Sequence, residues 1–97
     1  MADGIEVKGL NGESIVFDGV TVAKFKHHGK QETARNPVST YRETSVQQAT
    51  KLFGKPKVPA EYQVVVACSS LMSLTVDEAG KPALDELVAA LDAARQG

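Results

Sequence analysis

Two glycine-bearing dipeptides near the start of the chain, Asn11-Gly12 and Asp18-Gly19, restrict its fold more than any other feature. A two-residue type I′ turn needs positive φ at both central residues, and Asn, Asp and Gly tolerate that conformation best. The runs on either side of these dipeptides are rich in Val, Ile and Phe, which favour strands. The sequence therefore predicts a three-stranded antiparallel meander over the first 26 residues.

The turn lengths also predict the register of this meander. Two-residue loops place Val7 opposite Val16 and Phe17 opposite Val20, and they bring the opposite charges of Glu13 and Lys24 together. Both faces of the sheet then carry apolar side chains. We therefore expect the sheet to curl or to be covered on both sides.

The middle of the chain is the ambiguous part. Residues 27–36 are polar and lack a period, which is typical of a loop or a frayed strand end. Over 45–53, apolar side chains recur at helical spacing and Ser45 with Gln48 forms a capping box, so a short helix is favoured. A strand is the alternative, because Thr44, Val46 and several neighbours are strand formers. Residues 55–61 contain two prolines and predict a stiff linker.

The C-terminal part predicts a strand pair and a helix. Residues 62–68 and 71–76 are β-prone runs separated by Ser69-Ser70. From Pro82 to about residue 95, Leu84, Leu87, Val88 and Leu91 form an apolar stripe at helical spacing. The fold class expected for the single domain 1–97 is therefore α+β. Its parts are a curled antiparallel sheet made of the meander and this strand pair, a short central helix, and a C-terminal amphipathic helix packed on the sheet.

Few residues indicate a catalytic, metal-binding or cofactor-binding role. Cys68 is the only cysteine, which excludes an internal disulfide, and it ends an apolar strand as a small buried hydrophobe would. His27 and His28 are adjacent, so in a strand they would point to opposite faces and could not easily share a metal. No phosphate-binding glycine motif, nucleophile motif or carboxylate pair is present. We therefore expect no enzyme activity, cofactor, metal or small-molecule substrate.

The charge distribution is uneven although the net charge is −1. Residues 24–57 carry eight lysines and arginines against two glutamates, and both flanking parts are acidic. Cations gathered in this way attract nucleic acid, other anionic surfaces or acidic proteins. A solvated rim that protects a sheet edge from pairing is the other interpretation. The candidate anion-binding or partner-binding residues are Lys24, Lys26, His27, His28, Lys30 and Arg35.

Residues 9–22, with the hairpin Phe17-Asp18-Gly19, resemble the opening of small bacterial pleckstrin-homology-like modules. The Thr44 segment, the strand around Leu74 and the final helix follow in roughly the order of that family. The resemblance implies a partly open sheet capped by a C-terminal helix and a non-enzymatic role in binding or assembly. The family has several strands between residues 30 and 60, where this sequence predicts a loop, a short helix and a linker.

The function expected from the sequence is a non-catalytic interaction module that acts in protein assembly, with a protein partner or self-association through a sheet edge or the terminal helix. One alternative is a binder of nucleic acid or anionic surfaces through residues 24–35, and another is a small enzyme or enzyme inhibitor without a recognisable motif. No apolar run is long enough to span a membrane, and the first residues lack a signal-peptide pattern. A cytoplasmic location is therefore expected.

Overall fold

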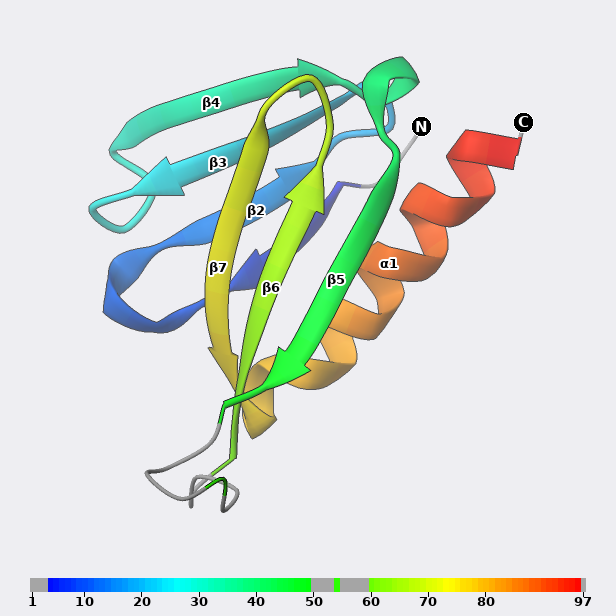
Figure 1. Ribbon diagram of the computed structural model, residues 1–97. Helices are drawn as coiled ribbons and strands as arrows, with labels where there is room; N and C mark the ends of the chain where they lie inside the picture. Colours follow the sequence, from blue (N-terminus) through cyan, green and yellow to red (C-terminus); the bar gives the residue numbers. More distant parts are fainter. Residues whose placement is uncertain (1–3, 50–53, 55–59, 97) are drawn as a thin grey trace.

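The computed structural model describes residues 4–49, 54 and 60–96. Over these residues the chain forms two antiparallel sheets and one long C-terminal helix, which confirms the α+β class (Figure 1). The single sheet expected from the meander and the C-terminal strand pair is wrong, because these strands belong to two different sheets. Strands β5–β7 run across the direction of strands β2–β4 in this view. The first sheet has the order β1 (Ile5–Lys8), β2 (Ser14–Phe17), β3 (Thr21–Lys26), β4 (Gln31–Pro37), the second has the order β5 (Glu43–Gln48), β6 (Glu61–Ala67), β7 (Leu71–Asp77), and the helix is α1 (Lys81–Gln96).

The terminal helix is the element that the sequence predicted best. Its stripe residues Leu84, Leu87 and Leu91 are fully or almost fully buried and join the hydrophobic core formed by both sheets. Pro82 lies in the first turn, where its missing N–H is not needed. The helix packs against β1, so the C-terminal end of the chain closes one side of the N-terminal sheet.

Two predicted elements of the middle segment are wrong. The expected loop over 27–36 contains strand β4, which is polar because it is an edge strand whose side chains are mostly exposed. The favoured helix over 45–53 is replaced by strand β5 up to Gln48, while residues 50–53 lie outside the described part. The β-propensity of Thr44 and Val46, with pairing to β6, outweighs a helical period that no neighbour supports. Most of the expected linker also lies outside the described residues.

The first hairpin differs from prediction by one residue. The turn η1 (Leu10–Gly12) has three residues, with Asn11 at φ 64° and Gly12 at φ 74°, and the Gly9 N–H donates to the Glu13 carbonyl across it. Val7 therefore lies opposite Ile15 instead of Val16. A shift of one residue changes which side chains of the two strands share a face. Val7 and Ile15 now share one face, and both are fully buried.

In the second hairpin the side chains lie on the predicted faces, but each residue of β2 pairs with a residue of β3 two positions later than predicted. Asp18 pairs with Thr21, so Gly19 and Val20 are the central turn residues and Gly19 takes φ 96°. Glycine at the first central position suits a type II′ turn. As a result Phe17 lies opposite Val22, and Glu13 still meets Lys24 through an ion pair.

With these registers, the inward-facing side chains of the first sheet form two rows across the strands. Polar residues stand at inward positions of β3 and β4, and both are buried: Lys24 belongs to one row and Asn36 to the other. The rows are Val7, Ile15, Lys24, Ala34 and Ile5, Phe17, Val22, Asn36. Burial of both residues means that their polar groups need partners inside the fold.

Two close contacts hold strand β7 across the first sheet. Near its start, the Asn36 amide donates to Ser70 Oγ at 2.9 Å and to Met72 Sδ at 3.6 Å, and its oxygen accepts from Ser69. Further along the strand, Gly9 lies so near β7 that a Cβ there would stand 2.5 Å from Leu74 Cδ1 and 2.6 Å from the Thr75 oxygen. The second contact therefore requires a residue without a side chain.

We expect Gly9→Ala to lower the free energy of unfolding by about 1–3 kcal/mol, because the added methyl overlaps β7 and the backbone has to shift. Urea denaturation measures this loss. The control is Gly4→Ala, whose Cβ would stand at an ordinary 3.5 Å from the Phe17 oxygen, and it should change stability by less than about 0.5 kcal/mol. Equal stability of the two variants would show that the Gly9 contact does not hold the sheets together.

Candidate functional site

Four of the six basic candidate residues are exposed at one turn, whereas Lys24 and Arg35 form ion pairs with other residues of the fold. Lys26, His27, His28 and Lys30 are exposed at the turn between β3 and β4. His27 and His28 both have positive φ, at 55° and 56°, and the turn continues through Gly29. This turn, the β3–β4 tip (26–30), is the part of the basic segment that can meet an anionic partner.

Lys24 does not belong to that surface. Its side chain is 11% exposed and its ammonium lies 2.8 Å from Glu13 Oε1. The hydrogen bond from Lys24 lowers the pKa of the Glu13 carboxyl, although partial burial acts in the opposite direction. The pair neutralises a cation at an inward sheet position, so Lys24 contributes to the fold.

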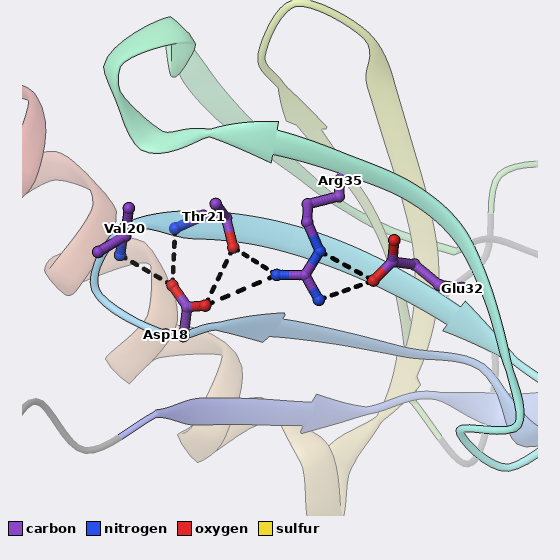
Figure 2. A network of polar contacts seen from close by, with 5 residues as sticks. All are labelled: Asp18, Val20, Thr21, Glu32 and Arg35. Carbon is purple, nitrogen blue, oxygen red and sulfur yellow. Dashed lines mark hydrogen bonds and ion pairs between the residues drawn. The ribbon is translucent and has the colours of Figure 1, made fainter.

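Arg35 is exposed but its guanidinium is fully engaged, as Figure 2 shows. Nε and Nη2 lie 2.8 and 2.7 Å from Glu32 Oε1, and Nη1 donates to Thr21 Oγ1 at 2.6 Å. Nη1 also lies 3.6 Å from Asp18 Oδ2. Arg35 therefore links β4 to the β2–β3 turn and is less available to an anionic partner than the residues of the tip.

The Asp18 carboxylate organises the same turn. It accepts hydrogen bonds from the backbone N–H groups of Thr21 and Val20 at 2.7 and 2.8 Å and from Thr21 Oγ1 at 3.0 Å. These bonds, led by the one from the Thr21 backbone, hold the pKa of Asp18 below its ordinary value. The network explains why the turn begins one residue later than the Asp-Gly signal predicts.

Within its described residues, the structure gives little support for a catalytic, metal-binding or small-molecule site. Burial raises the pKa of the Cys68 thiol, so the unreactive protonated form is favoured. Among residues 4–49, 54 and 60–96, no three His, Cys, Asp or Glu side chains are grouped to hold a metal ion. One hollow beside β1 has a volume of about 280 Å³, at the lower limit for small-molecule sites, and its lining mixes both charge signs: Glu6, Lys8, Gly9, Gly12, Glu13, Ser14 and His28.

The outer edge of β5 is the feature that the sequence did not reveal. Ala49 N–H donates to the Glu61 carbonyl at 2.8 Å, which makes residues 49 and 61 a hydrogen-bonded pair. Such pairs alternate along an antiparallel ladder, so Glu43, Ser45 and Gln47 also bond to β6. The backbone groups of Thr44, Val46 and Gln48 must then point away from the sheet, and they have no backbone partner among the described residues.

Each of the other three sheet edges is contacted by a neighbouring element or carries features that discourage strand pairing. Helix α1 packs against β1, and Gly9 lies against β7. Strand β4 carries Glu32 and Arg35, ends at Pro37 and has an irregularity opposite Lys24 and Phe25, and these are devices that prevent edge pairing. Strand β5 has no proline and no register shift, and Glu43 is its one charged residue.

On the outer face of the second sheet, charge is confined to the first and last rows, at Glu43, Glu61 and Asp77. Its two central rows hold only neutral side chains, of which four are exposed: Ser45, Gln47, Gln63 and Ser73. Leu71, in the row towards the β6–β7 turn, is 73% exposed. On the inner face Val46 is 42% exposed, because β5 extends beyond the part of the sheet that the core covers. From Thr44 to Gln48, the β5 edge therefore combines outward backbone groups with uncharged side chains.

Comparisons with known proteins do not assign this site. No protein-family model, curated protein or solved structure matches the chain. Within the described part of the chain, none of the helices is long and apolar enough to cross a membrane.

We expect the two halves of the Glu13–Lys24 pair to differ in their effect on stability. Glu13→Gln leaves a buried ammonium without its counter-charge and should cost about 1–3 kcal/mol at pH 7. Lys24→Met removes the charge from the buried position and leaves Glu13 partly accessible to water, so its cost should be less than about 1 kcal/mol. Urea denaturation of both variants makes the comparison, and a larger cost for Lys24→Met would contradict it.

The effect of Glu13→Gln should also depend on pH. Because the pKa of Glu13 is lowered in the fold, the carboxylate stabilises the protein above its unfolded pKa, and this stabilisation is lost as pH falls through the folded pKa. The difference between the native chain and the variant should therefore be constant from pH 5 to 7 and shrink below about pH 4.3. Glu86→Gln, a change of the same charge on the exposed side of α1, is the control and should show little effect.

Proposed function

We propose that this chain is a non-catalytic interaction module that binds a protein partner by strand addition at β5. The observation that carries the proposal is the open edge described above, with the outward backbone groups of Thr44, Val46 and Gln48. An extended segment that pairs there gains main-chain hydrogen bonds, and neighbouring side chains select the sequence. The two neutral central rows beside β5 offer such a segment no buried charge to desolvate.

The architecture supports the resemblance to small bacterial pleckstrin-homology-like modules as part of this proposal. Strands β4 and β5 occupy the region between residues 30 and 60 where that family has strands. Two antiparallel sheets with a C-terminal helix also agree with the capped sheet that the resemblance implies. The resemblance and the open edge each favour a role in binding or assembly.

The β3–β4 tip supports binding to nucleic acid or another anionic surface as a second candidate function. Lys26 and Lys30 are exposed there beside His27 and His28. With Lys24 buried and Arg35 engaged, few cations remain, so the affinity should be low and should fall steeply with salt.

A proline substitution tests the main proposal. Val46→Pro removes an N–H that points away from β6, so it should leave the sheet intact and block strand addition. A protein captured from native extract by the unchanged chain should be lost with Val46→Pro and retained with Lys26→Ser/Lys30→Ser. In the purified complex, the amides of Thr44, Val46 and Gln48 should exchange hydrogen more slowly than in the free chain.

The reverse pattern would contradict strand addition. Capture that survives Val46→Pro but is lost with Lys26→Ser/Lys30→Ser, and that weakens with added salt, would support the β3–β4 tip instead. Circular dichroism of both variants confirms that each is folded before capture is compared.

A further inference from the structure

We infer that the segment added to β5 is β5 of a second copy of this chain, paired antiparallel about a two-fold axis at Val46. This inference rests on the proposed function, because it uses the same open edge and names the occupant. The sequence of β5, Glu-Thr-Ser-Val-Gln-Gln, is suited to pairing with itself. It contains no like charges that the symmetric arrangement would bring face to face.

The backbone determines the register of this pair. Only residues whose N–H and C=O point outward can bond to the second copy, and these are Thr44, Val46 and Gln48. An axis at Val46 pairs Val46 with its own copy and Thr44 with Gln48 of the second copy, so every outward group finds a partner. Moving the axis to Ser45 would pair Gln48 with Arg42, whose N–H is already bonded to the Ala67 carbonyl at 2.8 Å.

The side chains agree with the same register. Val46 lies on the inner face opposite Val64 and is 42% exposed, and the axis places the two Val46 side chains against each other. On the outer face Ser45 lies opposite Gln47 of the second copy, which is a neutral pair. The net charge of −1 leaves little long-range repulsion between two copies.

The two copies would form one continuous sheet from β7 through both β5 strands to the other β7. The neutral central rows of their outer faces would then join into one larger surface. Helix α1 and the first sheet of each copy remain outside the new pairing. The arrangement closes the open edge of each copy by the same contact. A closed two-fold dimer of this kind uses the β5 edge of both copies, so strands cannot add at that edge without limit.

Charge substitutions at the axis test the inference. Sedimentation velocity over a range of concentrations should show the native chain change from monomer to dimer. Val46→Lys places two ammonium groups opposite each other and Val46→Glu two carboxylates, so each variant alone should dimerise at least about tenfold more weakly. A mixture of the two variants should recover dimerisation, since Lys then meets Glu at the axis.

Several outcomes would overturn the inference. A native chain that stays monomeric up to about 1 mM, where even weak association is visible, excludes the dimer. A dimer that both variants retain places the interface elsewhere, and two variants that do not recover on mixing exclude the axis at Val46. Ala89→Lys on the exposed side of α1 is the control and should leave the native behaviour unchanged. A monomeric native chain would leave the proposed function to the capture experiment, which fails or succeeds separately.

Discussion

The fold depends on how strand β7 is held across the first sheet. Gly9 allows the backbone of the first hairpin to approach Leu74 and Thr75, and Asn36 bonds to the residues where β7 begins. Between these two contacts the inward side chains of both sheets form one core, to which α1 adds Leu84, Leu87 and Leu91. Because β7 is fixed in this way and β6 pairs on its other side, β5 becomes the strand farthest from the contacts that join the sheets. The open edge is thus a consequence of which strand is anchored.

The same arrangement explains why the cations of residues 24–35 do not form one basic surface. The row that contains Val7 and Ile15 also places Lys24 inward, where Glu13 neutralises it. Arg35 binds Glu32 and Thr21 on the outer side of the first sheet and keeps the β2–β3 turn against β4 (Figure 2). Residues that are close in sequence are therefore distributed over two faces and a turn. Within residues 24–35, the exposed lysines, Lys26 and Lys30, both lie at the β3–β4 tip. The net charge of a segment predicts a charged surface only when the register of its strands is known, because the register decides which face each side chain occupies.

The sequence predicted those elements that bury many apolar side chains. Strands β6 and β7 and helix α1 carry clear apolar patterns, and both hairpins were recognised from their glycine dipeptides. The register of the first hairpin was not predictable from Asn11-Gly12 alone, because that dipeptide fits both a two-residue turn and the three-residue turn that includes Leu10. Strand β4 was missed because Gln31, Glu32 and Thr33 are exposed and carry no period. The burial of Asn36, by contrast, depends on a contact with residues 69–72, which are distant in sequence.

The missed strands and the candidate site are related by one physical cause. An edge strand pairs on one side only and is covered less by the core, so selection for folding leaves its sequence weakly patterned. The alternating Thr44, Val46 and Gln48 are a faint strand signal for this reason, and Val46 is half exposed for the same reason. A partner that pairs with β5 would supply the missing neighbour and cover that valine. On the proposed function, the stretch of chain that local sequence patterns describe least well is also the stretch whose structure binding would complete. Strand β4 is equally weak in pattern, but it carries the charges, the irregular pairing and the proline that discourage another strand.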